Sequence, residues 1–313
     1  MCMCTAVSLN LDNHYFGRNL DYFHSFGQTM IITPRNYKFT FTNGIVSDSH
    51  FAIIGMALEN NNYPLYFDAA NEKGLCVAGL NFPQFCRYNK SSKNKVNIAS
   101  FELIPWILSQ CDSAKKAARL CENINITNTS FSPDLPPTPM HWIISDKLNS
   151  YTLEQTKYGL KIYENPVGVL TNSPSFDIQM INLSHYVNIT NNNCKNKFML
   201  NIDIKPYSNG LGAYGIPGDF SSMSRFVRVS FLKLSAVKQE NEIQNINTFF
   251  HILYSVYQLK GSVQSDNGYM HTYYTSCIDT DKCIYYYTSY DKHDIYSLSL
   301  FDKNLDTNKL FIF

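Results

Sequence analysis

The chain opens with Cys4-Thr-Ala-Val-Ser-Leu9, turns at Asp12-Asn13 and continues through His14-Tyr-Phe-Gly-Arg-Asn-Leu-Asp21. The alternation of the first segment and the turn residues that follow it predict a β-hairpin. Such a hairpin carries Cys4 at the start of one strand, and Arg18 and Asp21 on the returning strand. The opening sequence therefore predicts a thiol, a cation and a carboxylate close to one another.

This combination would suit an N-terminal cysteine nucleophile, although a cysteine taken by itself is ordinarily a small buried hydrophobe. A thiol attacks as the thiolate, and its pKa is ordinarily about 8.5. If Cys4 is the first residue, its α-amine, with a pKa of about 7.7–8.0, can accept the thiol proton and later protonate the leaving amine. Arg18 would favour the thiolate, and Asp21 would hold the amine in place. Because a peptide-bonded nitrogen cannot accept a proton, residues 1–3 must be absent from the active enzyme.

The composition excludes several classes of protein. The 313 residues are 44% hydrophobic and 16% charged, without a repeat or linker, so we expect one packed domain over residues 1–313. With 26 Lys and Arg against 25 Asp and Glu, the chain has no basic field for nucleic acid. The apolar run Phe51–Leu58 is too short to cross a bilayer. Residues 1–17 contain none of the Lys or Arg that begins a signal peptide, and they become polar at Asn10, Asp12 and Asn13, so we expect a cytoplasmic protein without a membrane partner.

Blocks of strands and blocks of helices follow one another along the chain. Strands are predicted at 29–33, 37–42, 51–56, 75–80, 140–145, 151–155, 160–163, 272–278 and 283–288. Helices are predicted at 101–121 with a break at Asp112-Ser113, at 222–238, and from Ile243 to near Gly261 with Ile246, Phe250, Leu253 and Tyr257 on the same stripe. This order indicates an α+β fold of stacked layers rather than repeated βαβ units.

Motifs for other functions lack the context that they require. Gly210-Leu-Gly-Ala-Tyr-Gly215 has dinucleotide-binding spacing, but Ile216-Pro217-Gly218 follows where a helix is needed. Asp279-Thr-Asp281 lacks the glycine and glutamate of a calcium loop and is interpreted as a hairpin turn. The histidines show no zinc spacing, so no metal site is expected. Cys277 and Cys283 flank that turn and are expected to be reduced thiols.

Several blocks in the same order resemble the choloylglycine hydrolases, the family of bile salt hydrolases and penicillin V acylases. The blocks are Cys4-Thr-Ala-Val7, Tyr15-Phe-Gly-Arg-Asn-Leu-Asp21, Asn71-Glu-Lys-Gly74, Ala78-Gly-Leu-Asn-Phe-Pro83, Gly168-Val-Leu-Thr-Asn-Ser-Pro174, Pro217-Gly-Asp-Phe220, Ser224-Arg-Phe226 and Tyr285-Tyr-Tyr287. The resemblance implies a four-layer αββα sandwich of the N-terminal-nucleophile hydrolase type. It also implies a homotetramer, no cofactor, and hydrolysis of the amide that joins a bile acid to glycine or taurine.

The same resemblance implies a role for each matching residue. Cys4 corresponds to the nucleophile, with Arg18 and Asp21 as its charged neighbours and Arg225 behind the cluster. The side chain of Asn172 and the backbone N–H of Asn81 correspond to donors for the oxyanion. Leu20, Phe131 and Leu135 lie in segments where the family places substrate-facing residues.

The start of the chain departs from the family pattern. Members commonly begin Met-Cys-Thr, whereas this chain reads Met1-Cys-Met-Cys4-Thr5. We favour Cys4 because Thr-Ala-Val follows it and because its spacing to Arg18 fits a short hairpin. Cys2 stays an alternative, since residues two apart in a strand point the same way. Translation from Met3, followed by ordinary removal of that Met, is favoured over cleavage of a three-residue propeptide.

Two other functions are left open by the sequence. A penicillin V acylase would share the mechanism, but related acylases tend to carry Tyr where this chain has Asn81. A non-catalytic lipid-binding protein of the same fold would not need Cys4, Arg18, Asp21 and Asn172 together. The sequence favours hydrolysis of conjugated bile salts over both.

Overall fold

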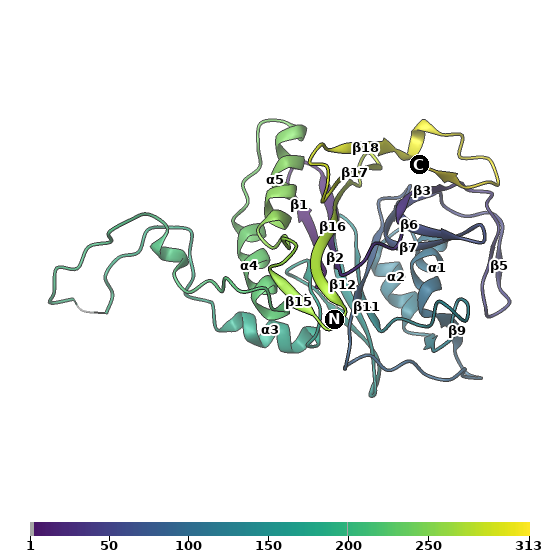
Figure 1. Ribbon diagram of the computed structural model, residues 1–313, viewed down its shortest axis with the longest axis horizontal. Helices are drawn as coiled ribbons and strands as arrows, with labels where there is room; N and C mark the ends of the chain where they lie inside the picture. Colours follow the sequence, from purple (N-terminus) through teal and green to yellow (C-terminus); the bar gives the residue numbers. More distant parts are fainter. Residues whose placement is uncertain (1–2, 199) are drawn as a thin grey trace.

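The computed structural model describes residues 3–198 and 200–313, and two large antiparallel sheets form its centre (Figure 1). The first sheet has the order β14-β1-β2-β16-β17-β18, with β15 paired to β16. Its strands are β1 (Thr5–Asn10), β2 (His14–Tyr22), β14 (Val169–Leu170), β15 (Val263–Ser265), β16 (Gly268–Asp279), β17 (Ile284–Ser289) and β18 (Tyr296–Ser299). The predicted hairpin is its first pair, in which Ala6 lies opposite Arg18.

The second sheet has the order β13-β12-β11-β8-β7-β6-β3-β19. Its strands are β3 (Thr29–Thr33), β6 (Ile53–Asn60), β7 (Tyr63–Asn71), β8 (Cys76–Asn81), β11 (Met140–Ser145), β12 (Ser150–Thr156), β13 (Gly159–Glu164) and β19 (Phe311–Ile312). Two short pairs lie beside it: β4 (Phe39–Thr40) with β5 (Val46–Ser47), and β9 (Val96–Ala99) with β10 (Ile124–Thr127).

Helices cover the outer face of each sheet (Figure 1). On the first sheet lie α4 (Ser222–Ser235) and α5 (Glu242–Tyr254), with α3 (Phe176–Ser184) packed on α4. On the second sheet lie α1 (Leu103–Gln110) and α2 (Ala114–Cys121). The molecule is therefore a four-layer αββα sandwich, and the predicted fold class is confirmed. None of the helices in residues 3–198 and 200–313 is long and apolar enough to cross a bilayer.

Apolar side chains fill the layers between these elements. One core cluster joins the facing sides of the two sheets to α4 and α5 through residues such as Phe226, Phe249 and Leu253. A second cluster lies between the second sheet and α1 and α2, around Trp106 and Trp142. Helices on the outer face and the other sheet on the inner face thus bury the central strands of each sheet.

Most predicted elements form, and the exceptions have physical causes. β7 was not predicted, because Pro64 and Asp68 interrupt its apolar pattern, yet Asp68 is fully buried. α3 was also missed, since little of it is buried. Ile243 was placed on the buried stripe of α5 and is 72% exposed, whereas Ile246 is buried. Of the predicted strand at 37–42, only Phe39–Thr40 is a strand.

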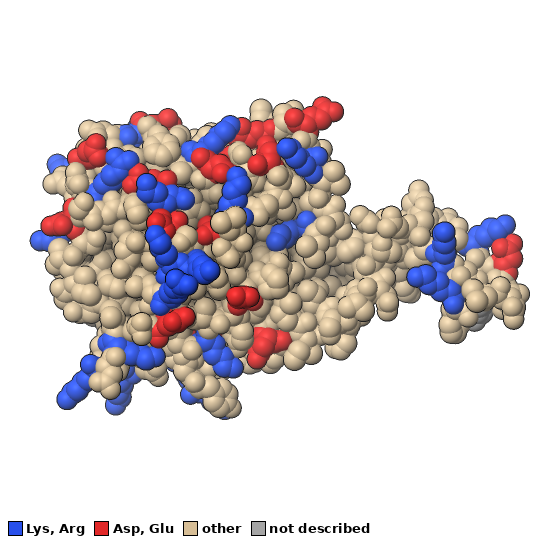
Figure 2. Space-filling model, turned by 180° about the vertical axis from the view of Figure 1, so that it is seen from behind, with Lys and Arg blue, Asp and Glu red and all other residues tan. Residues whose placement is uncertain are grey.

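A long arm leaves the body between α3 and α4 and projects to one side in Figure 1. We define the arm as residues 187–216, of which residue 199 lies outside the described residues. Its exposed apolar side chains include Val187, Phe198, Leu200, Ile202, Ile204, Tyr207 and Tyr214. In Figure 2 the arm is covered mostly by uncharged residues, with charges near its tip, while acidic and basic residues are interspersed over the body. The glycine motif that begins at Gly210 lies in this arm.

Gly17 allows β16 to lie close against β2 just before Arg18. A Cβ at Gly17 would lie 2.0 Å from the backbone oxygen of Ser276, and a backbone atom cannot move away by side-chain rotation. We expect Gly17→Ala to lower the free energy of unfolding by about 3 kcal/mol, measured by urea denaturation. Gly218→Ala is the control, because nothing lies within 4 Å of its Cβ position. Equal stabilities of the two variants would contradict the expectation.

Candidate active site

A cavity of about 180 Å³ lies between the sheets and brings together most of the predicted site residues. Its lining includes Cys4, Arg18, Leu20, Asn81, Phe131 and Leu135, all of which were predicted from the sequence. The remaining walls are largely apolar and include Phe26, Leu58, Leu65, Phe67, Pro136, Pro137 and Met140. An apolar cavity with a few polar groups at one end is typical of a binding site for a small amphipathic molecule.

Cys4 immediately precedes β1 and is 1% exposed. Its Sγ lies 3.9 Å from the backbone oxygen of Asp21, and the backbone N–H of Met3 donates to that same oxygen at 3.4 Å. The hairpin therefore places the thiol beside the end of β2, as the spacing predicted. Cys2, the alternative nucleophile, lies outside the described residues.

Arg18 is buried and reaches from the first sheet to the second. Its Nη1 donates to the backbone oxygens of Gly79 at 2.6 Å and Phe67 at 3.1 Å. Arg18 and Leu20 line the cavity, as alternation along β2 requires, whereas Asp21 belongs to the other face of the strand. The guanidinium is a permanent positive charge within the lining of the cavity.

The carboxyl group of Asp21 is buried and accepts a hydrogen bond from Thr272 Oγ1 at 2.6 Å. The pKa of this carboxyl is raised to about 8: burial is the largest cause, and a negative charge on Cys4 adds to it, whereas Arg225, Thr272 and Arg18 act in the opposite direction. A positively charged amine beside this carboxyl would favour its ionised form. Asp21 is therefore suited to hold an ammonium group.

Arg225 joins three segments that are far apart in the sequence. It lies in the N-terminal part of α4, where Ser221 caps the helix by accepting from the backbone N–H of Ser224. Nη1 of Arg225 donates to the backbone oxygen of Cys4 at 2.7 Å and to Thr5 Oγ1 at 2.6 Å. Because Arg225 is 1% exposed, these contacts show a buried structural cation rather than a charge on the helix surface.

Asn172 follows β14 and is oriented by contacts at both ends of its amide. Oδ1 accepts from Arg225 Nη2 at 2.8 Å, and Nδ2 donates to the backbone oxygen of Asn81 at 2.8 Å. Since an amide nitrogen carries two hydrogens, one donor of Asn172 is available beyond the bond to Asn81. The side-chain Oδ1 of Asn81 is buried and has no hydrogen-bond partner among the described residues.

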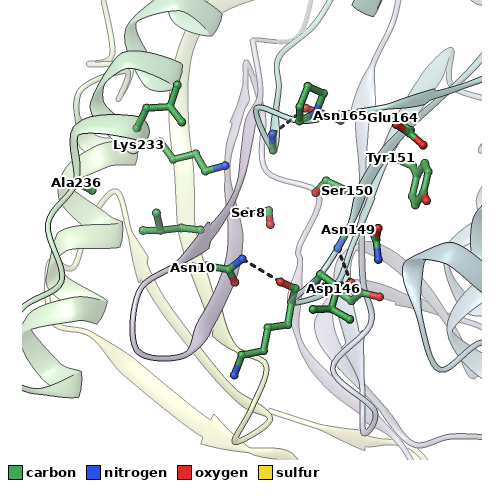
Figure 3. A pocket seen from close by; sticks show the side chains of 16 residues that line it. Ser8, Asn10, Asp146, Asn149, Ser150, Tyr151, Glu164, Asn165, Lys233 and Ala236 are labelled. Carbon is green, nitrogen blue, oxygen red and sulfur yellow. Dashed lines mark hydrogen bonds between the residues drawn. The ribbon is translucent and has the colours of Figure 1, made fainter. Parts of the chain in front are cut away.

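A second cavity, of about 480 Å³, lies at the far end of β1 and is polar. Figure 3 shows Lys233 reaching from α4 toward Ser8, with Asp146 and Asn149 on the opposite side. Its charges serve the fold: Lys233 Nζ donates to the backbone oxygen of Val167, and Asp146 accepts from the backbone N–H of Ala114 at 2.7 Å. None of the predicted site residues lines this cavity, so the candidate active site is the apolar cavity at Cys4.

The sequence did not indicate several groups of the site. The backbone oxygen of Phe67 that binds Arg18 and the hydroxyl of Thr272 belong to segments with no recognisable motif, and the backbone oxygen of Gly79 lies in a family block that gave no sign of this contact. The aromatic residues Tyr22 and Phe26 line the cavity, and the centroids of their rings lie 4.7 Å apart. The high frequency of aromatic residues directly after Asp21 is the sequence signal that could have indicated an aromatic wall. Within residues 3–198 and 200–313, no group of three or more His, Cys, Asp or Glu could hold a metal ion.

Comparison with known proteins gives matches over the whole chain. The family model of linear amide C–N hydrolases, choloylglycine hydrolase family, matches residues 4–313. The bile salt hydrolase/transferase of Lactiplantibacillus plantarum is 48% identical over 309 residues, which cover 98% of this chain and 95% of that protein. The bile salt hydrolase/transferase of Clostridium perfringens is 37% identical, again over 98% of this chain and 95% of that protein.

Solved structures show the same likeness. A variant of conjugated bile acid hydrolase from Clostridium perfringens superposes with a TM-score of 0.91 at 36% identity, covering 99% of this chain and 96% of that chain. Penicillin V acylase from Agrobacterium tumefaciens has a TM-score of 0.79 at 19% identity, covering 98% of this chain and 90% of that chain. At that identity, the second likeness shows a shared fold.

Proposed function

The chain belongs to the choloylglycine hydrolase family of linear amide C–N hydrolases, and we propose that it hydrolyses the amide bond of glycine- or taurine-conjugated bile salts. It is an amidohydrolase by family, and the products would be a free bile acid and the amino acid. The observation that carries the proposal is the apolar cavity that ends at Cys4. Its extended apolar wall suits a steroid body, and its polar end suits the amide.

The proposed reaction begins with Cys4. The α-amine of Cys4 takes the thiol proton, and the thiolate sulfur forms a bond to the amide carbon. The negative charge that develops on the amide oxygen is stabilised by the second N–H of Asn172 and by the backbone N–H of Asn81. The protonated amine then gives its proton to the leaving nitrogen as the C–N bond breaks, and water hydrolyses the resulting thioester.

The buried charges support this reaction in different ways. Arg18 favours the thiolate from within the cavity, and Asp21 holds the α-ammonium that forms when the thiol ionises. Arg225 keeps Cys4 and Asn172 in place through its hydrogen bonds.

The alternative functions have less support. A penicillin V acylase has the same fold, but the relatives that cover this chain at 48% and 37% identity are named for bile salts. A non-catalytic lipid-binding protein does not account for the amidohydrolase family or for the polar cluster at the end of the cavity.

We also propose that the arm mediates assembly into a homotetramer. The exposed side chains of the arm, such as Phe198 at 87% and Tyr207 at 86% exposure, are large and apolar, and a partner subunit would cover them. The cytoplasmic location stays a prediction from the sequence.

Substrate hydrolysis tests the proposed function directly. We expect release of glycine from glycodeoxycholate or of taurine from taurodeoxycholate, and slower release from penicillin V, measured as free amine. Cys4→Ser should lose turnover by at least about 10³-fold because a hydroxyl ionises far less readily than a thiol. Hydrolysis of penicillin V alone, or wild-type turnover by Cys4→Ser, would contradict the proposal.

Asn172→Ala tests the stabilisation of the oxyanion. We expect kcat to fall by about 10²–10³-fold, because one donor to the developing charge is lost. The neighbouring Ser173→Ala is the control, since the hydroxyl of Ser173 donates to the backbone oxygen of Pro83 and leaves Asn172 unchanged. A kcat of Asn172→Ala within twofold of the wild type would remove Asn172 from this role.

The start of the active chain tests the mechanism. We propose a single catalytic domain that begins at Cys4, because only a free α-amine can act as the base. Intact-protein mass spectrometry of active enzyme should therefore show a chain that starts at Cys4. Active enzyme that starts at Cys2 would transfer the role of nucleophile to Cys2.

A further inference from the structure

A buried carboxylate that the proposed reaction does not use lies behind Arg18. Asp68, on β7 of the second sheet, has no exposed surface. Tyr274 donates a hydrogen bond to its Oδ1, and Tyr285 and Ser276 donate to its Oδ2 at 2.7 and 3.0 Å. Hydroxyl groups of β16 and β17 in the first sheet therefore bind a carboxylate of the second sheet.

These contacts favour the ionised form of Asp68. The Oγ of Ser276 accepts the backbone N–H of Arg18 at 3.1 Å, so the hydroxyl hydrogen of Ser276 is directed to Asp68. Burial raises the pKa of the Asp68 carboxyl above its ordinary value, and the charge of Arg18 is the first of the influences that limit this rise, followed by the three hydroxyl groups. Hydrogen bonds donated to both oxygens stabilise a carboxylate more than a neutral acid.

Arg18 links this carboxylate to the cavity. Its Nη1 donates to the backbone oxygen of Phe67, the residue before Asp68, and to that of Gly79 on the neighbouring strand β8. The same side chain lines the cavity that ends at Cys4. Removal of the charge of Asp68 would therefore leave the positive charge of Arg18 less compensated, and the thiolate of Cys4 would be stabilised more strongly.

We propose that Asp68 is a positioning residue for Arg18: it is joined to Arg18 through the hydroxyl of Ser276 and the backbone of Phe67, and its carboxylate offsets part of the charge of Arg18 on the Cys4 thiol. The proposal rests on the proposed role of Cys4 as nucleophile. Among the described residues, the other titratable or charged groups around Cys4 include Asp21 on β2, Arg225 on α4 and Tyr274 on β16, and Tyr274 also contacts Asp68.

This arrangement has a consequence for reactivity. Two buried cations, Arg18 and Arg225, would by themselves hold the thiol as a thiolate of low pKa. Such a thiolate is abundant but a weaker nucleophile, because nucleophilicity falls with pKa. By offsetting one cation, Asp68 keeps the thiol near the pH at which the α-amine of Cys4 can exchange its proton.

Alkylation of Cys4 as a function of pH tests the proposal. The rate of reaction with iodoacetamide is measured on the whole chain, by mass spectrometry of the peptide that contains Cys4. Asp68→Asn keeps the shape and removes the charge, so the midpoint of the pH–rate profile should move down by about one pH unit. Asp68→Ser, a smaller neutral side chain, should give the same direction and replaces Asp68→Asn where that variant does not fold.

Tyr285→Phe is the matched control, because it removes one hydrogen bond from the same carboxylate and leaves the charge in place. Its midpoint should stay within about 0.3 pH unit of the wild type. The proposal would be overturned if the midpoints of Asp68→Asn and Asp68→Ser equalled that of the wild type. It would also be overturned if the midpoint of Tyr285→Phe moved down as far as that of Asp68→Asn. Alkylation needs no substrate, so this result is independent of whether the wild-type chain hydrolyses bile salts.

Discussion

The geometry of the site depends on the hydrogen bonds of one buried group, the guanidinium of Arg225. It binds the backbone oxygen of Cys4, the hydroxyl of Thr5 and the amide oxygen of Asn172. A buried cation that loses its partners is strongly destabilising, so the structure keeps all three in place. As a result, the start of β1, the segment after β14 and the first turns of α4 are held within hydrogen-bond distance of one side chain.

The two sheets are joined by a reciprocal exchange of polar contacts. Arg18 extends from the first sheet and binds backbone oxygens of the second, while Asp68 of the second sheet binds hydroxyls of the first. Apolar packing alone would let one sheet slide on the other at low cost, because it is non-directional. Directional hydrogen bonds between buried groups fix the sheets in one arrangement, and with it the position of Cys4 relative to Asn81.

Local signals in the sequence were sufficient for elements whose cause is local. The hairpin at the start, the break between α1 and α2, and the turn at Asp279-Thr-Asp281 form as predicted, because turn residues and helix ends act over a few neighbours. β7 was missed because its buried Asp68 looks like a surface residue until its partners on β16 and β17 are known. The prediction that Ile243 is buried was wrong. Hydrophobic periodicity indicates which face of a helix is apolar, but it does not indicate how much of that face the neighbouring sheet covers.

The sequence by itself determined that a thiol, a cation and a carboxylate lie on one hairpin. The turn residues Asp12-Asn13 pair the strand that follows Cys4 with the strand that carries Arg18 and Asp21, and this pairing depends only on neighbouring residues. The blocks of sequence that resemble the family indicated Asn81, Asn172 and Arg225 as site residues, but they did not indicate how these residues are arranged in space. Only the tertiary structure decided which face of β2 meets the cavity, how Asn172 is oriented and which groups surround Arg18. The reason is that these contacts join side chains to backbone atoms of distant strands, and such contacts leave no periodic pattern in the chain.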